Sequence, residues 1–153
     1  MTIDNEPGDE LHQKHLDSLL RVIEMAHRVG SPLVRIMTNK KEQILWGKNG
    51  AEKWNVAHGA WEKTLSLIRP ACEIARDARI KLVVETGNGT MVNSNWTARK
   101  LIEDLDAKDI LQILWDPANN CWCHEEAWPR GYETARGGYL GHSHVKDVQV
   151  DTP

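Results

Sequence analysis

Apolar residues recur at helical spacing in three long segments of the chain, and short apolar runs separate these segments. The helical segments span residues 9–29, about 61–79 and about 94–105, with Asn93 or Ser94 able to cap the third. The short runs, at residues 33–37, 82–85, 111–115 and 139–145, predict buried strands. A brief helix is expected near residues 131–136, and loops are expected at residues 39–55 and 116–130.

Alternation of strands with helices predicts an α/β fold in which about four parallel strands are joined by right-handed crossovers. A complete (β/α)8 barrel uses roughly 31 residues for each strand-helix unit. The 153 residues of this chain therefore hold about five units at most and predict a single domain, a partial TIM barrel with two open sheet edges. Pro70 is expected to bend or break the second helix.

Three of the predicted strands end on a polar side chain that could bind a metal ion. Glu85 ends one run, Asp116 ends the next, and the last run carries His142 and His144. Glu85, Asp116 and His144 are separated by 31 and 28 residues, about one strand-helix unit each. Because barrels of this kind place active sites at these strand ends, the spacing predicts one shared centre. Each acid could instead cap the following helix or pair with a base.

Oxygen and imidazole donors suit a divalent ion such as Mn²⁺, Mg²⁺, Co²⁺ or Zn²⁺. Such an ion polarises a sugar's carbonyl and hydroxyl oxygens, while a neighbouring carboxylate moves a proton on the adjacent carbon. This combination is what a sugar isomerase or epimerase needs.

Charge and composition narrow the class of partner. The net charge of −3, with no basic region, disfavours nucleic-acid binding. The first residues do not resemble a signal peptide, and no apolar run has the length of a membrane span, so we expect a cytoplasmic protein without a membrane partner.

The motifs VETGNG, WDPANN and HSHVKD, in this order and spacing, resemble the xylose isomerase-like (β/α)8 superfamily. That superfamily contains sugar isomerases, epimerases and inosose dehydratases, and the endonuclease IV type of nuclease is related to it. The resemblance implies that Glu85, Asp116 and His144 are three of four metal ligands, His144 matching because it stands three residues before Asp147. It also implies that Glu85 takes part in proton transfer.

Two departures from the family pattern affect the expected activity. Many members have a histidine where this chain has Asn119, which can bind a hydroxyl but is a poor proton carrier. The family's fourth ligand and second acid/base, a glutamate, would lie beyond Pro153, and the first strands would also be missing. We therefore expect an incomplete, inactive fragment of an isomerase or epimerase acting on a sugar or sugar phosphate. The alternatives are a lyase like the inosose dehydratases, or a non-catalytic half-barrel that assembles through its open edges. We also expect the chain to form homo-oligomers.

Other polar residues have two possible roles each. Arg35 either holds a carboxylate or substrate inside the barrel or forms an ion pair between strands, the second being favoured. Lys146 either neutralises an enediolate or pairs with Asp147, and Asn88 is a candidate substrate contact. His142 is expected deeper in the barrel as a hydrogen-bonded group, because alternate strand residues share a face.

Two loops remain. Cys121, Cys123 and His124 could bind zinc, but their spacing is unlike that of structural zinc sites, so they are interpreted as residues at the rim of the pocket. The loop at residues 39–55, with Trp46 and Trp54, is interpreted either as a lid over substrate or as an oligomer contact.

Overall fold

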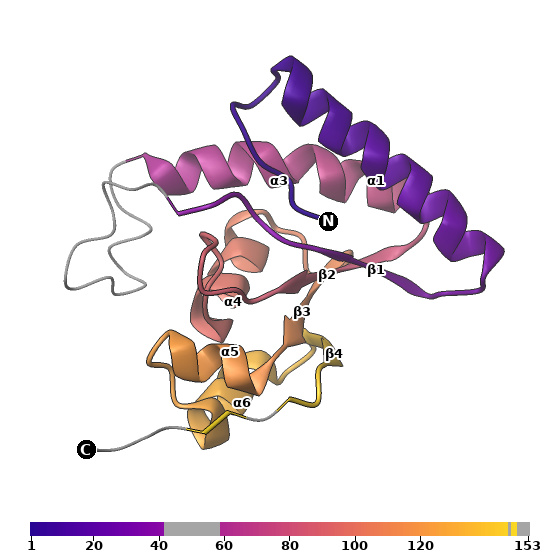
Figure 1. The fold of residues 1–153 in the computed structure, drawn as a ribbon. Coiled ribbons are helices and arrows are strands. Elements are labelled where there is room, and N and C mark those ends of the chain that lie inside the picture. The colour runs from indigo at the N-terminus through magenta and orange to yellow at the C-terminus, as the bar shows by residue number, and fades with distance from the viewer. Residues whose placement is uncertain (42–58, 147, 150–153) are drawn as a thin grey trace.

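The computed structural model describes residues 1–41, 59–146 and 148–149. Four parallel strands form one sheet in the order β1-β2-β3-β4, which is also their order along the chain (Figure 1). The strands are β1 (Leu33–Ile36), β2 (Lys81–Glu85), β3 (Leu111–Trp115) and β4 (Leu140–Ser143). Consecutive strands that pair side by side, with helices between them, are the arrangement of a TIM barrel. The prediction of a partial barrel with about four parallel strands is confirmed.

Three long helices cover one face of this sheet. They are α1 (Glu10–Arg28), α3 (Ala60–Asp77) and α4 (Asn95–Asp104). The helices α1 and α3 pack side by side over β1 and β2, and α4 packs against β3 (Figure 1). No helix of the described residues has the length and apolar character that spanning a membrane would need.

Apolar residues that alternate along the strands form the layer between sheet and helices. Leu82 and Val84 of β2 pair with Leu111 and Ile113 of β3, and all four are buried in the core. The intervening Val83 and Glu85 therefore face the other side of the sheet, the inner side of the partial barrel. This alternation explains why the inner face can carry polar side chains while the helices cover a continuous apolar face.

Local sequence signals account for most helix boundaries. Asp9 caps α1 by accepting a hydrogen bond from the backbone N–H of His12, and Ser94 forms a capping box with Thr97 at the start of α4. Pro70 lies within α3, which continues through it, so the predicted break is absent. The first residues also contact the sheet, because Thr2 forms a parallel bridge with Met37 at the end of β1.

The segment between β3 and β4 corrects the predicted loop at residues 116–130. It contains α5 (Pro117–Trp122) and a kinked segment, η2 (Ala127–Gly131), in which Trp128 has extended backbone angles, before the short helix α6 (Tyr132–Ala135). These turns are too short to show a helical period in the sequence, and they are held by contacts with other elements. One of these contacts is made by Glu125, whose carboxylate accepts hydrogen bonds from the backbone N–H groups of Asn95 and Trp96 at the start of α4.

Two further differences concern loops and strand length. Most of the predicted loop at residues 39–55, including Trp46 and Trp54, lies outside the described residues. The last strand is shorter than predicted, ending at Ser143, so His144 and Lys146 follow the strand as loop residues.

Candidate metal centre

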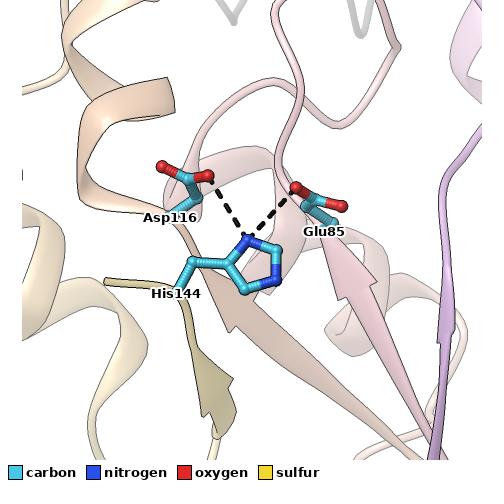
Figure 2. A group of neighbouring side chains, drawn as sticks. All are labelled: Glu85, Asp116 and His144. Atoms are coloured by element: carbon cyan, nitrogen blue, oxygen red, sulfur yellow. Dashed lines mark hydrogen bonds and ion pairs between the residues drawn. The ribbon is translucent and has the colours of Figure 1, made fainter. Parts of the chain in front are cut away.

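Three strand ends bring Glu85, Asp116 and His144 together, as the sequence predicted. Figure 2 shows the two carboxylates, at the ends of β2 and β3, converging on the imidazole of His144. The Nδ1 atom of His144 lies 3.4 Å from Oε1 of Glu85 and 3.4 Å from Oδ2 of Asp116. One possible donor atom from each residue lies within 4.8 Å of the others. Across the described residues, these three form the only group of histidine, cysteine and acidic side chains with this closeness.

The spacing of these atoms fits a divalent ion. Two donors bound at about 2.1 Å from one tetrahedral ion are separated by about 3.4 Å, since zinc-nitrogen and zinc-oxygen bonds have about that length. The two distances from His144 Nδ1 agree with this separation. Two carboxylates and one imidazole also form a donor set that Mn²⁺, Mg²⁺, Co²⁺ and Zn²⁺ accept. The residues present therefore fit a metal ion without selecting among these four.

Burial differs between the two sides of the centre. Glu85 and Asp116 are buried, being 7% and 1% exposed, whereas the side chain of His144 is 37% exposed. A small molecule would therefore reach the centre from the side of His144.

Asp116 uses its two carboxylate oxygens differently. It is the N-cap of α5, where Oδ1 accepts a hydrogen bond of 3.1 Å from the backbone N–H of Asn119. Oδ2 faces His144 Nδ1 and also lies 3.4 Å from the Nζ atom of Lys146. The capping role and the candidate ligand role, considered as alternatives from the sequence, are both compatible with the geometry.

The environment of Asp116 favours its charged form. Burial alone would raise the pKa of Asp116, but the hydrogen bond from the Asn119 backbone and the nearby groups of His144 and Lys146 outweigh burial and lower the pKa. An ionised carboxylate is the form that binds a metal ion.

The two carboxylate oxygens of Glu85 also have different partners. Its Oε2 atom lies 2.6 Å from Nη1 of Arg35, on the neighbouring strand β1, while Oε1 faces His144. The favoured interpretation of Arg35, an ion pair between strands, agrees with this contact, and the carboxylate that Arg35 holds is the candidate ligand.

Asn119 and Lys146 lie beside the centre. The Nδ2 atom of Asn119 donates a hydrogen bond of 2.7 Å to the backbone carbonyl of Thr86, and Oδ1 accepts one of 2.8 Å from Lys146. The sequence did not reveal this connection, since no local pattern links the residue after Glu85 to the loops after β3 and β4. The alternative partner of Lys146, Asp147, lies outside the described residues.

The remaining candidates are more distant from the centre. His142 is exposed, which corrects the expectation of a deep position, and its ring centroid lies 6.2 Å from that of His144. Asn88 is also exposed, and its Oδ1 atom lies 3.9 Å from the thiol of Cys123. Cys121 contacts the carbonyl of Pro117 within α5, and no group of three possible ligands includes Cys121, Cys123 or His124 among the described residues.

Comparison with known proteins supports the fold. A structure described as a D-tagatose 3-epimerase-like protein has a TM-score of 0.68 at 18% identity, covering 95% of this chain and 55% of that chain. The IOLI protein with a bound zinc atom has a TM-score of 0.72 at 14% identity, covering 99% and 51%. A xylose isomerase-like TIM barrel protein from Mycobacterium smegmatis, in complex with magnesium, has a TM-score of 0.65 at 17% identity, covering 95% and 50%.

The chain spans about half the length of each of these three proteins. A search of curated proteins gave no match. A family model described as xylose isomerase-like TIM barrel matches residues 2–153, nearly the whole chain. This chain therefore belongs to the xylose isomerase-like TIM barrel family.

Proposed function

We propose that the chain carries the metal centre of a sugar isomerase or epimerase. The observation that carries the proposal is the convergence of Glu85, Asp116 and His144, with both 3.4 Å distances measured from one imidazole nitrogen. The similarity to a D-tagatose 3-epimerase-like protein supports the substrate class, and the zinc and magnesium in two similar structures support a divalent ion.

Each residue of the centre has a defined task in this proposal. Glu85, Asp116 and His144 hold the ion, which when bound would polarise the carbonyl and hydroxyl oxygens of a sugar. The carboxylate of Glu85 takes the proton from the carbon next to the sugar carbonyl, as the family resemblance implies.

Four polar residues are proposed to contact the sugar. Lys146 places an ammonium group 3.4 Å from Asp116, where it would stabilise negative charge that develops on a substrate oxygen. Asn119 orients Lys146 through the hydrogen bond of 2.8 Å and is the neighbouring hydroxyl contact. Asn88 and His142 are both exposed. Asn88 follows Glu85 by three residues and His142 precedes His144 by two, so we assign both to the more remote hydroxyl groups of the sugar.

Thermal unfolding tests the metal centre. Metal-stripped protein should melt at a higher temperature when Mn²⁺, Mg²⁺, Co²⁺ or Zn²⁺ is added, because an ion that binds only the folded state adds about 2.7 kcal/mol at 100 times its Kd. Glu85→Gln and His144→Ala should abolish this shift. Glu10→Gln and His27→Ala, both on the exposed face of α1, are matched controls that should keep it. Absence of any shift in the unaltered chain would contradict the proposal.

Proton exchange tests the reaction class. The metal-loaded chain is incubated with ketohexoses and aldoses in D₂O, and NMR detects deuterium on the carbon next to the carbonyl. We expect incorporation that depends on the ion and on Glu85 even if the chain does not complete the reaction, because removal of the proton and return of a deuteron to the same carbon need Glu85 but not the family's second acid/base. Metal-dependent stabilisation without exchange on any of these sugars would support a metal site but contradict an isomerase or epimerase.

A further inference from the structure

Arg35 and Glu85 face each other across neighbouring parallel strands. Arg35 pairs in register with Val83, and alternate residues share a face, so Arg35 and Glu85 both point to the inner side of the sheet. The 2.6 Å between Nη1 of Arg35 and Oε2 of Glu85 is the short distance of a charge-assisted hydrogen bond. The side chain of Glu85 is 10% exposed and that of Arg35 is 47% exposed.

The contact divides the two oxygens of Glu85 between two partners. Oε2 is held by the guanidinium group, and Oε1 is directed toward Nδ1 of His144 at 3.4 Å. We propose that Arg35 is a positioning residue of the metal centre, which retains Oε2 and thereby presents Oε1 of Glu85 as a single donor atom. This inference rests on the proposed metal centre and adds a residue that is not itself a ligand.

A single donor from Glu85 has a consequence for the substrate. Glu85, Asp116 and His144 then supply one donor atom each, whereas an ion such as Mg²⁺ takes six. Positions remain for two neighbouring oxygens of one substrate. The three single donors leave three of the six positions, and a two-oxygen contact from Glu85 together with the family's fourth ligand would leave only one, too few for both substrate oxygens. Arg35 therefore favours substrates that chelate the ion through an adjacent carbonyl and hydroxyl group.

A positioning role of Arg35 and a purely electrostatic role predict opposite changes in metal affinity when Arg35 is removed. The guanidinium group of Arg35 is a positive charge close to the ion, so its removal would tighten metal binding if charge alone mattered. If Arg35 positions Glu85, its removal should weaken binding, since loss of a group that orients a ligand typically lowers affinity about 10- to 100-fold. The sign of the change therefore separates the two roles.

The test compares Mn²⁺ binding by metal-stripped variants, using calorimetry and the electron paramagnetic resonance signal of free Mn²⁺. Arg35→Met keeps the length of the side chain without charge or donors and should bind Mn²⁺ about tenfold more weakly or worse. Arg35→Gln keeps a donor N–H without the charge and should be less impaired. The control is Arg136→Met, which removes an exposed guanidinium group 2.6 Å from Glu133 and should leave affinity unchanged.

The outcomes distinguish this inference from the proposed function. If the unaltered chain binds Mn²⁺ and both Arg35 variants bind it equally or more tightly, the positioning role is wrong and the metal centre stands. Failure of the unaltered chain to bind Mn²⁺ overturns both. Circular dichroism without metal checks that each variant is folded. If Arg35→Met does not fold, Arg35→Gln decides the question: weaker Mn²⁺ binding supports the positioning role, and undiminished binding contradicts it.

Discussion

The side chain of Asn119 donates a hydrogen bond of 2.7 Å to the backbone carbonyl of Thr86, the residue directly after Glu85. This bond joins the start of α5 to the end of β2. Thr86 is fully buried, so its carbonyl oxygen lies away from solvent. The position of the Glu85 backbone relative to Asp116 therefore depends on an amide at residue 119.

Asn119→Ala should destabilise the chain by about 1–3 kcal/mol, because the buried carbonyl of Thr86 would lose its donor. Urea unfolding of the metal-free protein measures this change. Asn88→Ala is the matched control, since Asn88 is exposed and lies two residues beyond Thr86, and it should change stability by less than about 0.5 kcal/mol. Equal effects of the two substitutions would contradict a structural role for the hydrogen bond to Thr86.

The hydrogen bond from Trp61 of α3 to Asp104 of α4 predicts a pH dependence of stability. Burial opposes ionisation of Asp104, but hydrogen bonds from Lys100 and Trp61, both of 2.6 Å, outweigh burial and lower its pKa from the ordinary value of 3.8. A pKa that is lower in the folded state adds stability that is fully present above pH 3.8. This stability is lost as the pH falls through the folded-state pKa.

Asp104→Asn should remove this increment. The urea midpoint of the unaltered chain should exceed that of the variant at pH 6, and the difference should shrink at pH 3 and below. Trp61→Phe, which removes one of the two donors to Asp104, should reduce the pH dependence of the midpoint without abolishing it. A difference between the chain and Asp104→Asn that is independent of pH would contradict this account.

Much of the fold could be predicted because each strand is a short apolar run with a clear end. The predicted strand at residues 111–115 matches β3, and α1, α3 and α4 begin and end within a few residues of their predicted bounds. Ser94 proved to be the cap of α4 because its side chain reaches the N–H of Thr97. The prediction for residues 116–130 was wrong because α5 is only six residues long and depends on the cap that Asp116 supplies.

The centre could be predicted in part for the same reason. The separation of about one strand-helix unit between successive residues indicated that Glu85, Asp116 and His144 share one edge of the sheet, and the structure brings them together. Periodicity gives the face of a strand but does not show what covers that face, which is why the exposure of His142 was not foreseen. Nor does it give the reach of a side chain, so the contact between Arg35 and Glu85 could not be distinguished from other possible pairs.

Gly141 lets β4 approach the strands that precede it. A Cβ atom at Gly141 would lie 2.7 Å from Cβ of Gln112 on β3 and 2.8 Å from Cγ1 of Val83 on β2. Both distances are shorter than real contacts of this kind, and neither partner is the free end of a flexible side chain. Gly141→Ala should therefore displace β4 from β3 and destabilise the chain by about 1–3 kcal/mol.

The same substitution should also weaken Mn²⁺ binding, because His144 follows β4 three residues after Gly141 and depends on that strand for its position beside Glu85 and Asp116. Gly89→Ala is the control, since an added methyl group there meets no atom within 4 Å. Calorimetry of the two variants should show a lower affinity only for Gly141→Ala. Unchanged affinity in a destabilised Gly141→Ala variant would mean that the loop after β4, rather than the packing of β4, positions His144.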